Sequence, residues 1–258
     1  MKKTLMASSA LGLGLTLSSP GMVTLYDSFE DFNNGTGSTG NNITVAGWEG
    51  YFGHAGTTPV NRTVLTPSGL PTTHRGGLFD GTNSSSGTSV NDYIYFQSAN
   101  SADGGDSAMN YFAHTSTGSV FTAFDASDYA TDLTANWVQG RSGSTSDYRL
   151  AVQVGGTWYA NDSDIGGGNG SRTFDLNGQD WVEITSVSGS PLSLGGTSTD
   201  SATLFGLGDV TGVGFYAAQH GTGVTLRIDN FTLTGVPEPS ALFLSLGALG
   251  AFFIRQRS

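Results

Sequence analysis

The sequence predicts an all-β fold, a two-sheet antiparallel β-sandwich of the jelly-roll type. Short segments rich in β-branched and aromatic residues recur between clusters of Gly, Asn, Ser and Asp, which is the pattern of short strands joined by turns. No window of twelve or more residues in the body shows helical spacing of apolar residues. With 37% hydrophobic and 12% charged residues, the chain can form a core, which excludes a disordered acidic tail and a coiled coil. It has no Cys, so it is not a disulfide-stapled miniprotein.

The expected strands follow one another along the whole body. They cover residues 23–26, 43–48, 90–96, 120–124, 148–154, 157–160, 181–187, 210–217 and 224–233. In 148–154 the large residues Tyr148, Leu150 and Val152 alternate with smaller or polar ones, which indicates one buried and one wet face. Gly155-Gly156 separates this strand from the next and predicts a two-residue hairpin turn.

Three features are expected between or within the strands. In 224–233 the apolar residues change phase after Ile228, so one face can be buried throughout only if a β-bulge lies near Asp229-Asn230. Residues 124–129 predict one short helical turn, capped by Ser127. Gly-, Ser-, Thr- and Asn-rich segments at 33–42, 81–89 and 161–171 predict long surface loops.

The first 21 residues have the layout of a secretory signal peptide. Lys2-Lys3 precedes an apolar run that ends at Leu17 and is followed by small residues. The run is shorter than the roughly 20 apolar residues of a membrane-spanning helix, which favours a signal peptide over an anchor. We expect signal peptidase to cut after Gly21, a single β-sandwich domain over 22–235, and a separate C-terminal segment over 236–258.

The C-terminal segment combines prolines, an apolar run and a basic end. Pro237-Glu238-Pro239 is followed by an uncharged apolar run over 241–254 and then by Arg255 and Arg257. The prolines prevent a continuous helix or strand, and the apolar run predicts a short transmembrane helix. The arginines would keep the far end of this helix on the cytoplasmic side of the inner membrane.

These C-terminal features resemble the PEP-CTERM sorting signal. Proteins with this signal are exported by Gram-negative bacteria, often alongside exopolysaccharide genes, and a membrane enzyme called exosortase recognises and processes their tails. The resemblance implies that Pro237, Glu238 and Pro239 are the recognition residues and that Arg255 and Arg257 form the basic end. This basic end is thin, because a glutamine splits the two arginines. The alternative is an ordinary C-terminal anchor whose prolines end the preceding strand.

The two ends of the body resemble the first and last strands of concanavalin-A-like jelly rolls. The residues that carry this resemblance are 26–30 (Tyr-Asp-Ser-Phe-Glu) and 227–233 (Arg-Ile-Asp-Asn-Phe-Thr-Leu). The resemblance implies that the two terminal strands pair, which would place the C-terminal segment beside the first strand.

Charge excludes one class of partner. Residues 23–235 contain 20 acidic residues and six arginines, with no lysine. A body this acidic, without clustered cations, cannot neutralise phosphates, so nucleic acid is not an expected partner.

Catalytic signatures are missing from the sequence. Glycoside hydrolysis needs two carboxylates around one bond, and jelly-roll glucanases carry them on one strand as Glu-x-Asp-x-x-Glu. Glu183 is the one Glu of the body within an expected strand, and Thr185 stands two residues after it. The four histidines are scattered, and there is no cysteine nucleophile and no Gly-x-Ser-x-Gly elbow. We therefore expect no enzymatic activity.

Calcium is the one inorganic partner that the sequence suggests, and no other cofactor is expected. Residues 161–166 (Asn-Asp-Ser-Asp-Ile-Gly) superficially resemble a calcium loop. However, Gly166 stands where the third oxygen ligand belongs, and Thr173 where the closing Glu belongs. A structural calcium ion between Asp27 and Asp229 on the terminal strands is a different arrangement. The alternative for all these acids is that they are solvated.

Trp158-Tyr159, beside the expected hairpin turn, is the candidate for stacking against a sugar. Consecutive strand residues face opposite ways, so we expect one of the two side chains to lie outside. The alternative for each aromatic residue is packing in the core of the sandwich.

Together these observations favour an exported, non-enzymatic protein of the cell surface or extracellular matrix. It would be tethered to the inner membrane through its C-terminal helix until an exosortase-type enzyme processes it. The alternative is a carbohydrate-binding, lectin-like module that acts on exopolysaccharide. A glycoside hydrolase is the least favoured function.

Overall fold

The structure is a computed structural model that describes part of the chain in twelve stretches. These are residues 21–28, 48–54, 60–61, 74–83, 90–98, 107–114, 121–129, 132–142, 146–166, 168–185, 193–219 and 225–238. Met22–Glu238 forms one compact unit. The expected signal peptide up to position 20 and the segment from Pro239 onward lie outside the described residues, and so do Arg255 and Arg257. Among the described residues, no helix has the length and apolar composition needed to cross a membrane.

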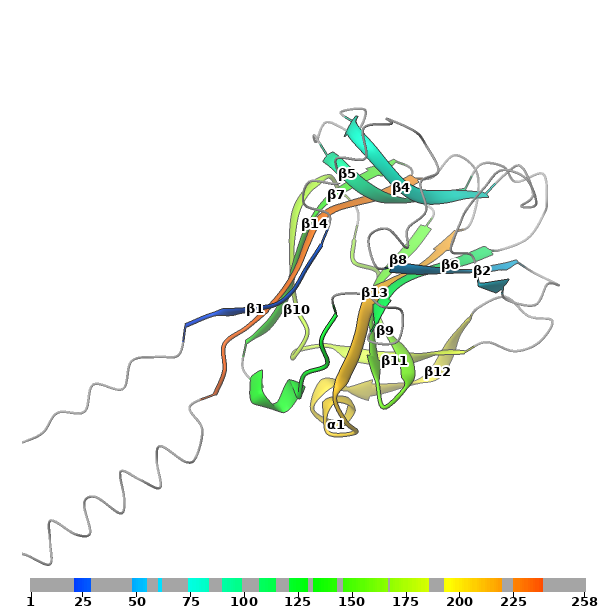
Figure 1. Cartoon of the computed structure of the whole chain (residues 1–258). Helices are drawn as coiled ribbons and strands as arrows, with labels where there is room; N and C mark the ends of the chain where they lie inside the picture. The colour runs from blue at the N-terminus through cyan, green and yellow to red at the C-terminus, as the bar shows by residue number, and fades with distance from the viewer. Residues whose placement is uncertain are drawn as a thin grey trace, which may run out of the picture. The chain divides into compact units, whose positions relative to one another are not determined.

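Most of the described chain is strand, and the strands form two antiparallel sheets (Figure 1). The predicted all-β sandwich class is therefore confirmed. The first sheet has the order β10 (Gly170–Asp175), β7 (Leu133–Ser142), β14 (Thr225–Gly235), β5 (Val90–Ser98) and β4 (His74–Asn83), with β1 (Val23–Ser28) also paired to β14. The second has the order β12 (Ser193–Asp200), β11 (Asp180–Thr185), β9 (Thr157–Asn161), β8 (Ser146–Val154), β13 (Val210–Gln219), β6 (Ser107–His114), β2 (Trp48–His54) and β3 (Val60–Asn61).

The last strand, β14, is the centre of the first sheet. It pairs with β7 along its whole length. On its other edge, residues 225–228 pair with β5 and residues 231–235 pair with β1. The first and last strands of the body are therefore neighbours, as the jelly-roll resemblance implied.

The core lies between the two sheets and is built from large aromatic residues. Phe231 of β14 contacts Phe215 of β13, with ring centroids 5.3 Å apart, and Trp48 of β2 stacks on Phe215 at 6.4 Å. The Trp48 indole nitrogen donates a 2.8 Å hydrogen bond to the Tyr26 hydroxyl, which connects β2 to the terminal strand β1. The buried face expected for β8 is confirmed, because its large residues, Tyr148 included, belong to this core. The other face is less exposed than expected, since Ala151 is buried and Arg149 and Gln153 are half-buried.

Two local predictions about the backbone are confirmed. Gly155 and Gly156 have φ values of +58° and +84° and join β8 to β9, and positive φ at both positions is what a type I′ hairpin turn requires. In β14 the pairing with β7 shifts between Asp229 and Thr232. Asn230, with φ of +50°, is the one non-glycine residue with positive φ among those described. The bulge lets Ile228 and Phe231 both reach the core.

Several sequence predictions are wrong. The described part of 120–124 holds one isolated bridge, from Phe124 to Val210, instead of a strand. The expected strand 43–48 is not among the wrong predictions, because only Trp48 lies within the described residues and it begins β2. The helical turn exists as a 3-10 helix, Ala126–Tyr129, but its cap is Asp125 instead of Ser127. The Asp125 carboxylate accepts hydrogen bonds from the Ser127 backbone N–H at 2.8 Å and from its hydroxyl at 2.7 Å.

The second group of errors concerns strands that the sequence analysis left out. These are β2 beyond Trp48, β3, β4, β6, β7, β10 and β12. Two of the expected loops are partly strand: residues 81–83 belong to β4, and residues 170–171 begin β10. The segment 33–42 lies outside the described residues.

Candidate functional site

Both ends of the folded unit lie at one end of the sandwich. In the β1–β14 pair Val23 is opposite Gly235, so the first residue of the first strand meets the last residue of the last strand. We call this end the terminal pole. It consists of the Val23 end of β1, residues 235–238, residues 125–132 as far as they are described, and the turn after β10 (Figure 1).

The residues that follow β14 are bound to the body at the terminal pole. The Val236 backbone N–H donates to the Asp132 carbonyl at 3.1 Å, and the Glu238 N–H donates to the Asp128 carbonyl at 2.8 Å. Pro237 between them is half-buried, whereas Glu238 is exposed. Two of the three predicted sorting residues, Pro237 and Glu238, are thus placed on the body, and the third, Pro239, lies outside the described residues.

Gly235 lies close against the ring of Tyr129. A Cβ atom on Gly235 would lie 2.5 Å from Cδ1 and 2.9 Å from Cγ of Tyr129. No side chain larger than hydrogen fits there unless the ring moves. The glycine at the end of β14 therefore permits a close contact.

The segment that receives these contacts is itself fixed to both sheets. Phe124 exchanges two backbone hydrogen bonds with Val210 of β13, at 3.2 and 2.9 Å. The Phe124 ring meets Tyr129 edge on at 5.8 Å. The Tyr129 carbonyl accepts a 3.1 Å hydrogen bond from the Asn177 side-chain amide in the turn after β10.

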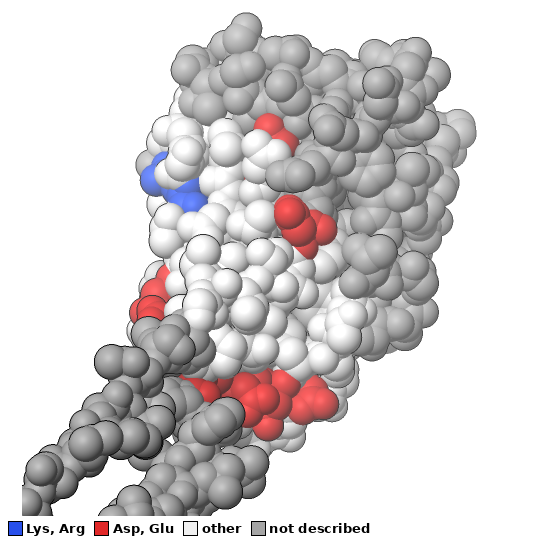
Figure 2. Space-filling model, turned by 60° about the vertical axis from the view of Figure 1, so that its left-hand side comes forward, with Lys and Arg blue, Asp and Glu red and all other residues white. Residues whose placement is uncertain are grey.

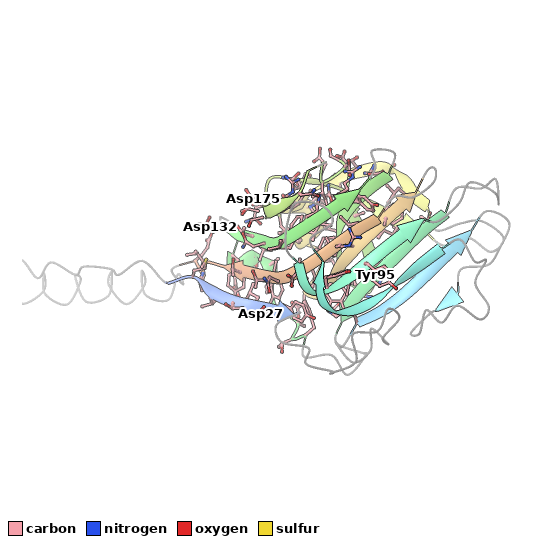
Figure 3. The ribbon with its side chains drawn as sticks, turned by 90° about the horizontal axis from the view of Figure 1, so that it is seen from above. Asp27, Tyr95, Asp132 and Asp175 are labelled. Carbon is pink, nitrogen blue, oxygen red and sulfur yellow. The ribbon has the colours of Figure 1, made fainter. Side chains whose placement is uncertain are left out.

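The terminal pole is acidic. Its exposed carboxylates belong to Asp125, Asp128, Asp132, Asp175 and Glu238. Figure 3 shows Asp132 and Asp175 close together at this end of the first sheet, and Figure 2 shows acidic side chains gathered at the lower end of the visible face. The two hydrogen bonds from Ser127, of which the side-chain one has the larger effect, lower the pKa of Asp125 below its ordinary value of 3.8.

The arginine side chains that the structure describes lie away from the terminal pole. Arg141 stands near the opposite end of β7 from Asp132, and Arg227 near the opposite end of β14 from Glu238. Arg141 forms a 3.4 Å ion pair with Asp164, and Arg149 a 2.7 Å ion pair with Asp147. The terminal pole therefore gathers five exposed carboxylates, although other exposed acids, such as Asp162 and Glu183, lie elsewhere on the described unit.

A small hollow lies beside the pole, between the 3-10 helix and α1 (Ser201–Phe205). Its volume is about 210 Å³. Its lining is Ala126, Ser127, Asn177, Ser201, Ala202, Phe205 and Gly206. None of these side chains titrates or can act as an activated nucleophile without a base, so the hollow supports no acid–base chemistry.

The predicted sugar-stacking pair is split between the two faces of β9. Tyr159 packs against the main core. Trp158 is half-buried and lies opposite Gln153 of β8. The Gln153 side-chain oxygen accepts a 2.9 Å hydrogen bond from the Thr211 hydroxyl. Trp158 therefore stands on the outer face next to polar groups, whereas Trp137 and Trp181 are buried core residues.

The residues suggested for calcium have other surroundings. Asp27 is exposed and opposite Thr232 of β14, whereas Asp229 is buried and opposite Val138 of β7. Among the described residues, no three His, Asp or Glu side chains form a group that could hold a metal ion.

In the loop 161–166, the side-chain oxygens already accept hydrogen bonds from the protein. The Asp164 carboxylate accepts from the Tyr148 backbone N–H at 2.9 Å and pairs with Arg141. The Asn161 side-chain oxygen accepts from the Leu150 N–H at 2.7 Å. Asp162 accepts from the Ser198 hydroxyl at 3.1 Å. These contacts give the loop acids a structural role.

The sequence analysis did not identify Asp128, Tyr129 and Asp132 as a site. Gly235, two residues before Pro237, was the available signal, because a glycine within or at the end of a strand often marks a close backbone approach. Which residue would approach it was not visible, since Tyr129 and Gly235 lie 106 positions apart.

No protein-family model and no curated protein sequence matches the chain. Solved structures with some similarity include an exo-beta-agarase (12% identity, TM-score 0.36) and PfGH50B (10% identity, TM-score 0.31). The matches cover 66% and 65% of this chain but 23% of each of those chains. The binding domain of botulinum neurotoxin serotype G matches over 78% of this chain and 50% of its own, with 13% identity and a TM-score of 0.24.

Proposed function

We propose that this protein is an exported, non-enzymatic protein of the cell surface or extracellular matrix, sorted through its C-terminal PEP-CTERM-like segment. The acidic β-sandwich is the cargo. The segment from Val236 onward is the sorting signal that an exosortase-type membrane enzyme recognises, after signal peptidase has removed residues 1–21.

One observation carries the proposal. Pro237 stands two residues after the end of the last strand and is half-buried, and the Glu238 side chain that follows it is exposed. The pairing of Val23 with Gly235 brings the start of the folded unit to the same pole. The first and last residues of the folded unit, to which the two expected targeting segments are joined in the chain, therefore lie at the same pole.

The test is mass spectrometry of the mature protein from its native host. We expect an N-terminus at Met22 and a C-terminus that lacks Arg255–Ser258. A Glu238→Gln variant should accumulate with its tail intact, whereas a Glu183→Gln control, changed at an exposed carboxyl on β11, should be processed normally. Recovery of a secreted form with Arg255–Ser258 intact would contradict the proposal.

A second candidate function, carbohydrate binding, rests on the position of Trp158. A half-buried indole beside Gln153 and Thr211 on the outer face of the second sheet combines an apolar ring with hydrogen-bonding groups. This is the combination that stacks on a sugar ring and bonds its hydroxyls. A glycan array with the full chain, Trp158→Ala and Trp158→Phe tests it. Binding that is lost in the alanine variant and kept in the phenylalanine variant supports a lectin-like module.

A further inference from the structure

Three contacts bind the end of β14 and the residues after it to the body. An enzyme that recognised only the sequence of the tail would not require these contacts. Gly235 lies against the Tyr129 ring, Val236 donates to Asp132, and Glu238 donates to Asp128. We call Asp128, Tyr129 and Asp132 the tail clamp. All three residues lie within the short segment around the 3-10 helix, so one element of the body binds three positions of the emerging tail.

The proline at 237 is compatible with this arrangement. In an extended segment, alternate backbone N–H groups point the same way, and here the donors to the clamp are residues 236 and 238. Residue 237 has no N–H to donate, and its position in the alternation requires none. The proline therefore costs no hydrogen bond and holds the backbone extended between the two donors.

The clamp is rigidly supported. Phe124 connects it to β13 through two backbone hydrogen bonds, Asn177 ties the Tyr129 carbonyl to the turn after β10, and Asp125 caps the 3-10 helix. The tail is thus bound to a part of the body that is fixed at several points. Its bound conformation is set by the body.

We propose that the tail clamp presents Pro237 and Glu238 to the processing enzyme in one fixed backbone conformation, with the Glu238 carboxylate facing outward. This inference rests on the proposed sorting function. A peptide that is already ordered loses less conformational entropy when its partner binds, so affinity rises without a new contact. The surrounding carboxylates of Asp125, Asp128, Asp132 and Asp175 mean that the enzyme surface that approaches Glu238 carries positive charge.

The test uses the full chain in a host that carries the processing enzyme, with two readouts. The first is hydrogen exchange of the Val236 and Glu238 amides in the purified full chain, which reports the clamp whether or not the tail is a sorting signal. The second is the rate at which the tail is removed. The variants are Gly235→Ala, Tyr129→Ala, their combination, and Tyr129→Phe. Gly196→Ala on β12 is the matched control, because a Cβ there meets no atom within 4 Å.

Gly235→Ala should speed exchange at Val236 and Glu238 and slow tail removal, each on the order of tenfold, the factor that corresponds to about 1.4 kcal/mol. The double variant should behave like Tyr129→Ala alone, since the three atoms nearest to the added methyl all belong to Tyr129. Tyr129→Phe and Gly196→Ala should match the parent protein in both readouts.

The outcomes separate the two proposals. If Gly235→Ala frees the amides but the tail is removed at the parent rate or faster, presentation by the clamp is wrong and the sorting function stands. If the amides of the parent protein exchange as fast as those of an unfolded peptide, the clamp does not exist in solution. If Glu238→Gln is processed like the parent protein, the sorting function itself fails, and the exchange data still decide the clamp.

Discussion

Trp137 of β7 and Phe215 of β13 meet edge to face across the two sheets, with ring centroids 5.6 Å apart. Both side chains are buried, and Phe215 also contacts Trp48 and Phe231. Phe215 therefore joins four strands of the two sheets, β2, β7, β13 and β14, in one aromatic cluster.

Replacement of Phe215 by alanine should lower the free energy of unfolding by about 3–5 kcal/mol, because a cavity remains in a core held from both sides. Urea unfolding of the parent and variant, compared at constant slope, measures this. Leu207→Ala is the control: its side chain is 60% exposed, so its cost should stay within about 0.5 kcal/mol. Equal losses in the two variants would show that Phe215 is not a core residue.

Asn230 should be replaceable by glycine but not by valine. Its φ of +50° places it in the left-handed region, which costs an ordinary L-residue roughly 1–2 kcal/mol and a β-branched one at least as much. Asn230→Val should therefore lower the midpoint of urea unfolding, and Asn230→Gly should leave it nearly unchanged. If both variants lose the same stability, the Asn230 side chain matters and the backbone of the bulge does not.

Asn161 should be more important for stability than its position in a polar loop suggests. Its side chain is buried, accepts the Leu150 N–H at 2.7 Å, and donates to the Ser163 carbonyl. Asn161→Ala leaves the buried Leu150 N–H without this acceptor, at a cost of about 1–3 kcal/mol. Thermal unfolding in the presence of excess chelator measures the loss. The exposed neighbour Ser163 is the control, and Ser163→Ala should change little.

Asp125 should contribute to stability above its unfolded-state pKa. Hydrogen bonds from Ser127 lower the pKa of Asp125 in the folded protein below 3.8. The ionised carboxylate therefore stabilises the fold fully above the unfolded-state pKa, and this contribution is lost as the pH falls through the folded-state pKa. Asp125→Asn should unfold with a shallower dependence on pH as the pH falls below about 4, the ordinary pKa of an aspartate carboxyl. A curve for Asp125→Asn that matches that of the parent protein would refute the assignment.

The sequence predicted the parts of the fold that local physics determines. Gly155-Gly156 requires no knowledge of the rest of the chain, and the bulge at Asn230 follows from a change of phase within one strand. By contrast, β4 and β12 contain Gly-Gly pairs and many polar residues, and they are strands because β5 and β11 offer them backbone partners. Tertiary pairing overrides propensity there.

The candidate site was predictable to a smaller extent. The proline pair and Glu238 were evident from their local pattern, but the surface that receives them was not. Tyr129 carries no signal that connects it to Gly235, because the contact depends on how β14 and the 3-10 helix are placed by the two sheets. The surroundings of the 161–166 loop were hidden for a related reason: Asp164 and Asn161 find backbone and arginine partners that only the folded chain brings near.

The pairing of β1 with β14 has a consequence for the order of folding. Val23 is among the first residues of the body to be synthesised, and its partner Gly235 is among the last. Contacts between such distant positions form late, because a long loop must close before they contribute any stability. The pairing of β1 with β14 cannot form until residues 231–235 have left the ribosome. A chain of this topology stays incompletely folded until its last strand has been made, and an incompletely folded polypeptide can still be threaded through a narrow channel.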